Sequence, residues 1–248
     1  MTKTSRESRL LAVDPSLTAS GWSLFSVHNA KLLDVGIIVP AGPQVALSKR
    51  LEELQEKVSE LFRTLKLQAG DYLVCEGPAH LVLNPQSALK LERVRGIFEA
   101  VARSLKVSVP GRINPRTVHV EVLGLYGKQA RRNDVKKSAQ VVCTQLFGTE
   151  LNSILQNKNV SGRSANKIPQ DITDATLIGA LCVSKIQICL RSGVEVGEAF
   201  FNKRRPASGQ KSAAHNAKSN KTKSNGAVVW TEKDLIKLSK RVTVRGYD

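Results

Sequence analysis

Four acidic residues are the first feature of this sequence that could support chemistry. Asp14 follows the apolar run LLAV at 10–13, and Glu76 ends the run DYLVCE at 71–76. If these runs are parallel neighbouring strands, their ends lie about 5 Å apart at one edge of a sheet. Asp171 and Asp174 belong to PQDITDATLIGAL. A spacing of three residues places both on one face of a helix, so all four carboxylates can converge.

Converging carboxylates repel one another, and divalent cations would neutralise them. Oxygen ligands with incomplete protein coordination favour Mg²⁺, with Mn²⁺ as a substitute. Two ions per site, about 3.5–4 Å apart, suit phosphodiester hydrolysis: one activates the attacking water and the other stabilises the leaving 3′ oxygen. Each acid also has an ordinary interpretation. Asp14 could begin a turn before Pro15, and Glu76 could simply end a strand. Asp171 could be an acid favoured at a helix N-terminus, and Asp174 could be a solvated helix residue. The joint order of strand Asp, strand Glu and late D-x-x-D favours the catalytic interpretation.

The elements that must position these acids follow from hydrophobic periodicity and turn signals. Strands are predicted at 8–14, 20–27, 31–39, 71–76 and 106–110, the last ended by Pro110, and helices at 46–66, 85–105, 114–124, 134–147 and 169–188. Meandering strands followed by β-α-β units predict an α/β fold with a mixed sheet. The right-handed crossover rule places strand 71–76 parallel to and beside the first strand.

Charge points to a polyanionic partner. The 248 residues include 38 Lys and Arg against 21 Asp and Glu, a formal net charge of +17. Such an excess favours nucleic acid, although a basic tail that only aids solubility is the plainer alternative. The N-terminal MTKTSRESRL lacks the apolar region of a signal peptide, and no apolar run approaches the ~20 residues needed to cross a bilayer. Four cysteines without C-x-x-C spacing fit reduced core thiols, so a cytoplasmic protein with no membrane partner is expected.

Composition changes after about residue 200. Residues 201–227 are basic and contain almost nothing that could pack, so they are predicted to be a disordered tail that contacts phosphates or serves as a plain linker. Residues 228–248 include WTEKDLIKLSKRV, which resembles a short helix. The main domain is therefore expected over 8–190.

Longer stretches of the chain resemble one family. LAVDPSLTASGWSLF, YLVCEGP, NPQSALKLERVRGIFEAVARSLKVSV and PQDITDATLIGAL are similar, in order and spacing, to the RuvC-type Holliday-junction resolvases of the ribonuclease H-like superfamily. The resemblance covers about residues 8–188. It implies a five-stranded mixed sheet flanked by helices, a homodimer, and symmetric two-metal cleavage of a four-way DNA junction by a crossover junction endodeoxyribonuclease. It also assigns the four catalytic carboxylates to Asp14, Glu76, Asp171 and Asp174.

The resemblance further implies basic residues around the DNA. A family lysine beside the scissile phosphate matches Lys137 best, with Lys136 as the register alternative, and either could instead be a general backbone contact. A second basic position of the family falls near His119. The family's aromatic wedge is replaced by AH, so His80 is the candidate to stack there. The remaining predicted DNA contacts are Lys90, Arg93, Arg95, Lys128, Arg131, Arg132 and Lys136.

Other functions stay open at this stage. A related nuclease could act on a hybrid or another branched substrate, and a non-catalytic junction-binding protein could retain the acids as a relic. A branch-migration motor is a further possible partner. A sugar-kinase or actin-like ATPase would need a second glycine-rich phosphate loop and a longer chain.

Overall fold

The chain folds around one five-stranded sheet, described here from a computed structural model over residues 6–78, 85–126, 131–158 and 168–200. The strands are β1 (Arg9–Asp14), β2 (Ser20–Ser26), β3 (Leu32–Ile38), β4 (Tyr72–Glu76) and β5 (Ser108–Ile113). Their order is β3-β2-β1-β4-β5. β1 pairs antiparallel with β2 and parallel with β4, which confirms the mixed sheet and the predicted neighbour of the first strand.

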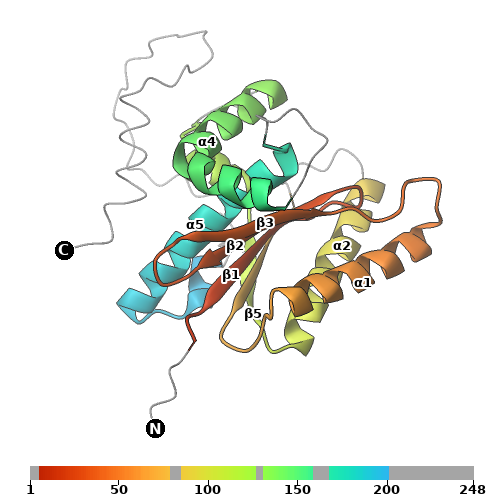
Figure 1. Cartoon of the computed structure of the whole chain (residues 1–248), viewed down its shortest axis with the longest axis horizontal. Coiled ribbons are helices and arrows are strands. Elements are labelled where there is room, and N and C mark those ends of the chain that lie inside the picture. Colours follow the sequence, from red (N-terminus) through yellow and green to blue (C-terminus); the bar gives the residue numbers. More distant parts are fainter. Residues whose placement is uncertain (1–5, 79–84, 127–130, 159–167, 201–248) are drawn as a thin grey trace, which may run out of the picture.

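Helices cover both faces of this sheet (Figure 1). α1 (Leu47–Thr64) and α2 (Pro85–Ser104) lie on one face, and α4 (Arg132–Asn157) and α5 (Gln170–Ser192) lie on the other, where α3 (Pro115–Glu121) also contacts α5. A short 3-10 helix, η1 (Val196–Phe200), packs against β5.

Strand β1 lies at the centre and is buried on both sides. Leu10 and Ala12 join the core under α4 and α5, whereas Leu11 and Val13 join the core under α1 and α2. Alternate residues of a strand face opposite sides of a sheet, so a run of four apolar residues serves two cores. This is why Asp14, the next residue, marks the edge where the apolar layers end.

Three predicted boundaries were wrong. β5 does not end at Pro110 but continues to Ile113. It is the edge strand, and its pairing with β4 is irregular around Pro110, so the missing N–H of proline is tolerated there. The helix predicted at 114–124 ends at Glu121, and the one predicted at 134–147 runs from Arg132 to Asn157.

Helix α5 corrects another expectation. By length and composition it could cross a membrane, contrary to the prediction that no segment could. Its apolar residues are largely buried, however, and pack against β1 and β2. The apolar character of α5 is therefore that of a helix at the centre of a protein core. The predicted tail at 201–227 and short helix at 228–248 lie outside the described residues.

Candidate active site

The first two acids meet at the carboxyl ends of β1 and β4. The parallel register pairs Val13 with Cys75, so Asp14 and Glu76 come next at the same level. The two carboxyl groups lie close enough for the charge of Asp14 to raise the pKa of Glu76. The sheet therefore brings together two residues that are 62 positions apart in the sequence.

Helix α5 supplies the other two acids from its first turns. Gly21 of β2 pairs with Asp14 across the strands. A Cβ atom added at Gly21 would lie only 1.9 Å from the carbonyl oxygen of Asp171, so α5 can approach β2 this closely because residue 21 has no side chain. Further along, the buried Ser23 Oγ donates a 2.7 Å hydrogen bond to the carbonyl of Ala175. These two contacts hold the start of α5 over the sheet edge that bears Asp14.

The four carboxylates act on one another electrostatically. Burial raises the pKa of Asp14 to about 7, and the charges of Asp174 and Asp171 add to the rise. Burial, followed by the charges of Asp14 and Asp174, raises the pKa of Glu76 well above its ordinary value. Burial and Asp171 raise the pKa of Asp174 to about 6. The structure thus places all four predicted acids in one cluster whose negative charge is poorly compensated.

This donor set suits a hard divalent cation, because it offers carboxylate oxygens from three different elements. One of the acids is also engaged by a neighbouring side chain: Asp174 accepts a 2.7 Å hydrogen bond from Gln170 Nε2. Across the described ranges, no group of three or more His, Cys, Asp or Glu side chains is arranged to hold a metal ion. The four acids therefore lie close enough to act on one another through their charges, and Asp174 is held by Gln170.

Comparison with known proteins identifies the family. A crossover junction endodeoxyribonuclease RuvC of Cupriavidus metallidurans is 31% identical over 138 residues, which is 50% of this chain and 74% of the relative. The RuvC of Hyphomonas neptunium is 32% identical over 120 residues, or 47% of this chain and 67% of the relative. No protein-family model matches the chain.

The chain belongs to the RuvC family.

Solved structures agree with the fold of this RuvC-family chain. Thermus thermophilus RuvC in complex with a Holliday junction substrate aligns with a TM-score of 0.52 at 16% identity, covering 75% of this chain and 96% of that one. The yeast mitochondrial Holliday junction resolvase Ydc2 aligns with a TM-score of 0.51 at 13% identity, covering 81% and 87%. At these identities the likeness concerns the fold alone.

The lysine near the acids of this RuvC-family chain is Lys136, which the sequence offered as the register alternative to Lys137. Lys136 lowers the pKa of Asp174 through its charge, so it is near enough to act on the cluster. One turn further along α4, Gln140 donates 3.0 Å hydrogen bonds to Ile168 O and to Thr173 Oγ1. Residues 136 and 140 share one helix face, and this face is turned toward the start of α5. Lys137 lies about 100° further around the helix. The structure therefore favours Lys136 over Lys137 as the basic neighbour of the carboxylates.

Arg95 does not border DNA, and that prediction was wrong. Its side chain is 2% exposed, and its guanidinium bonds the backbone of β4 and a carboxylate inside the protein. The positive charge of the guanidinium also opposes the rise in the pKa of both Asp14 and Glu76, without cancelling it. Helix α2 turns Arg95 inward, whereas Lys90 and Arg93 on the same helix are exposed.

The other predicted DNA contacts have mixed outcomes. Arg131, Arg132 and both lysines at 136 and 137 are exposed at the start of α4, as phosphate contacts must be. His119 is half-buried, and burial together with the nearby Arg116 lowers its pKa, so it is a weaker base than an exposed histidine. His80 and Lys128 lie outside the described residues.

Sequence reasoning missed Gly21, Ser23 and Gln140, which hold α5 in place. A glycine within a strand pattern is a recognised sign of close backbone approach, so Gly21 could have been found. Ser23 and Gln140 carry no such signal, because the local sequence does not show whether a serine or a glutamine bonds a distant segment.

Proposed function

We propose that this RuvC-family chain is a crossover junction endodeoxyribonuclease that resolves four-way (Holliday) DNA junctions in recombination and repair. The observation that carries the proposal is the convergence of Asp14, Glu76, Asp171 and Asp174 from β1, β4 and α5. Relatives covered over two thirds or more of their length are named crossover junction endodeoxyribonucleases. A cluster of acids at the carboxyl edge of a sheet in such a chain is best explained as nuclease machinery.

We propose Mg²⁺ as the metal, two ions per site, with Mn²⁺ able to substitute. The four carboxylates supply oxygen ligands, which hard cations prefer, and binding would relieve the repulsion that raises their pKa values. When bound, the ions would activate the attacking water and stabilise charge on the leaving 3′ oxygen. Asp14 and Glu76, on neighbouring strands, hold their ligand positions rigidly, and Asp171 and Asp174 complete the site from α5.

Basic residues would bind and orient the DNA. Lys136, beside Asp174, is proposed to stabilise charge on the scissile phosphate, with Lys137 as the alternative in register. The exposed Lys90, Arg93, Arg131 and Arg132 are proposed to contact the phosphate backbone. Each such contact releases counterions, so junction affinity should fall steeply as salt increases.

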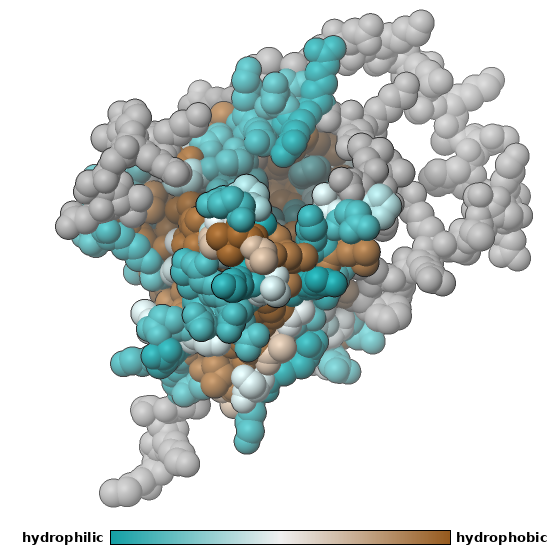
Figure 2. Space-filling view, turned by 90° about the vertical axis from the view of Figure 1, so that its right-hand side faces the viewer, coloured by the Kyte–Doolittle hydropathy of each residue, from teal (hydrophilic) through white to brown (hydrophobic). Residues whose placement is uncertain are grey.

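Junction resolution needs two cuts, and we propose that a homodimer makes them. Figure 2 views the side of the molecule that carries α1 and α2 in Figure 1, and apolar residues gather there among hydrophilic ones. A groove between these helices has an apolar floor that includes Phe62, Ile97 and Val101. Its rim has acids on α1, such as Glu56, and bases such as Arg93, so a two-fold copy can match opposite charges.

The dimer has its own test in Gly96→Arg. Gly96 lines this groove, and no atom lies within 4 Å of a Cβ added there, so the monomer should fold. Sedimentation should find a dimer for the natural sequence and a monomer for the variant. A natural chain that remains monomeric at high concentration contradicts the dimer, and a variant that stays dimeric moves the interface elsewhere.

The function itself is tested with a labelled immobile four-way junction and Mg²⁺, beside a linear duplex that has the same arms. Paired symmetric nicks in the junction alone support a resolvase, and Asp14→Asn should abolish the nicks while junction binding persists. Cleavage of the duplex too, or of an RNA–DNA hybrid, indicates a related nuclease with another substrate. Tight binding without any nick indicates a non-catalytic junction-binding protein. A branch-migration motor as a partner and a cytoplasmic location remain predictions.

A further inference from the structure

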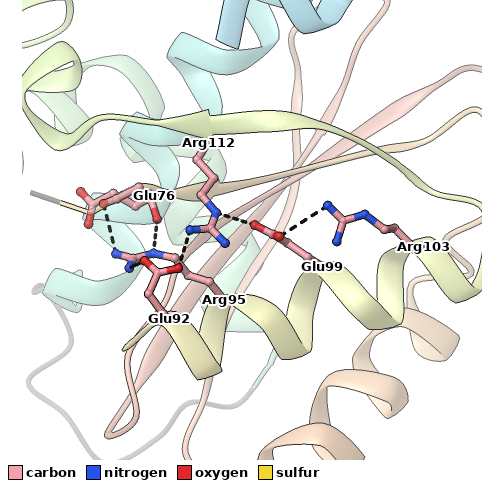
Figure 3. Close-up of polar contacts among 7 residues, drawn as sticks. Glu76, Glu92, Arg95, Glu99, Arg103 and Arg112 are labelled. Carbon is pink, nitrogen blue, oxygen red and sulfur yellow. Dashed lines mark hydrogen bonds and ion pairs between the residues drawn. The ribbon is translucent and has the colours of Figure 1, made fainter. Parts of the chain in front are cut away.

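A ladder of five charged side chains joins helix α2 to strand β5 beside the acid cluster (Figure 3). We call it the α2–β5 ladder; its members are Glu92, Arg95, Glu99, Arg103 and Arg112. Arg95 is the largest of the fully buried side chains in the described part of the chain. Burying an arginine is costly unless its charge and its donors are all used, so its surroundings show what it is for.

The guanidinium of Arg95 is fixed on three sides. Nε donates a 2.7 Å hydrogen bond to the carbonyl of Glu76, and Nη2 donates a 3.1 Å bond to the carbonyl of Gly77. Nη1 donates to a carboxylate oxygen of Glu92 at 2.7 Å. Two of its three contacts therefore hold the main chain at the place where β4 ends.

The rest of the ladder holds this guanidinium in place from β5. Arg112 Nη1 bonds Glu92 and Arg112 Nε bonds Glu99, both at 2.6 Å. Glu92 thus bridges Arg95 and Arg112, whereas Arg103 is a more exposed member that meets Glu99 at 3.5 Å. β5 also accepts a 2.7 Å hydrogen bond from the Gly77 N–H through the carbonyl of Ile113.

We infer that Arg95 is a positioning residue for Glu76, fixing the backbone at the end of β4 so that the Glu76 carboxylate faces Asp14. The inference rests on the proposed function, because it takes Glu76 as a ligand of the nuclease site. β4 ends at Glu76, and in the described part of the chain the two Arg95 bonds add to its pairing with Ile113 of β5 and to the Gly77 N–H bond in restraining this backbone. A purely apolar residue could fill the same space but could not bond two adjacent carbonyl oxygens.

The same helix presents its opposite side to the groove proposed as the dimer interface. Arg93, Gly96 and Ile97 line that groove, while Arg95 and Glu99 face the sheet. If α2 is held by the dimer on one face and by the ladder on the other, it would move little, and the position of Glu76 would stay fixed. The inference does not depend on the dimer, because all ladder contacts lie within one chain.

The test compares Arg95→Lys with Arg103→Met. Lysine keeps the positive charge, but a single ammonium group cannot hold two carbonyl oxygens and Glu92 in the planar arrangement of a guanidinium. Arg103→Met removes an exposed member of the ladder from the same helix and is the matched control. Thermal melts come first, and Glu92→Gln serves as a second variant if Arg95→Lys does not fold, because it removes the carboxylate that holds Arg95.

Two readouts separate positioning from a merely structural role. In single-turnover cleavage of the four-way junction, Arg95→Lys should react at least about tenfold more slowly, as is typical when a residue supporting a metal ligand is lost. Its junction affinity in Ca²⁺ should be unchanged. The Mg²⁺ concentration that gives the half-maximal rate should be higher. Calorimetric Mn²⁺ binding should weaken by a similar factor without DNA. Arg103→Met should match the natural chain in both.

The inference is overturned if a folded Arg95→Lys variant cleaves the junction at the natural rate and binds Mn²⁺ with natural affinity. It is also overturned if the loss of cleavage and of Mn²⁺ binding only matches the fraction of unfolded protein. If the natural chain does not cleave junctions, the proposed function fails, but Mn²⁺ binding still decides the inference. Natural Mn²⁺ affinity in Arg95→Lys then refutes it, and weakened affinity supports it.

Discussion

Substitution of Gly21 by alanine should slow junction cleavage strongly, although it adds only one methyl group. The added Cβ would meet backbone atoms of Asp171, which no side-chain rotation can move aside. Restoring an ordinary contact of about 3.4 Å requires the first turn of α5 to retreat by about 1.5 Å from β2. A displacement of about 1 Å in a catalytic group can cost about 10²-fold in rate.

The same clash should have a moderate effect on stability. Overpacking of this kind typically costs about 1–3 kcal/mol, which corresponds to a fall in Tm of about 2–12 °C for a chain of this size. Junction cleavage with Mg²⁺ at 25 °C should therefore fall by about two orders of magnitude in a protein that remains folded.

Gly148→Ala is the matched control for this experiment. Gly148 lies within α4, where an added Cβ makes an ordinary 3.4 Å contact with the Thr144 methyl group. The variant should cleave normally and gain up to about 1 kcal/mol, because alanine is the better helix former. Natural cleavage by Gly21→Ala at unchanged Tm would refute the argument that α5 depends on a bare backbone at residue 21.

Two further predictions concern charge. In EDTA, folded Asp14 keeps its proton to about pH 7 whereas the unfolded chain loses it near 3.8, so this residue's contribution to stability falls as pH rises through that window. The Tm of Asp14→Asn relative to the natural chain should therefore rise between pH 5 and 8, and a difference that is constant or falls would contradict the raised pKa. Lys136→Ala should slow junction cleavage by at least about tenfold and Lys137→Ala by much less, because only Lys136 acts on Asp174. Single-turnover rates that are equal, or reversed in order, would return the assignment to Lys137.

Much of the framework follows from local sequence pattern. The runs that became β1 and β4 are short and apolar, and each ends in an acid, because a carboxylate is least costly where a buried strand reaches the edge of the core. The D-x-x-D spacing places two acids on one helix face for the same local reason, and Gly193 ends α5 with the left-handed backbone that glycine favours. The four carboxylates could thus be grouped from the sequence alone.

Tertiary structure decided which basic residues serve the site and which serve the DNA. Lys90, Arg93 and Arg95 fall in one helical segment of similar composition, yet only Arg95 faces the sheet, because its turn of α2 packs over the end of β4. Pro110 would normally end a strand, but β5 is at the edge, where no further ladder needs its N–H. The sequence by itself determined the elements and the acids they carry, since these depend on neighbours within a few residues. The choice between Lys136 and Lys137, the burial of Arg95 and the close approach at Gly21 depend on contacts between distant segments, and only the folded chain specifies those.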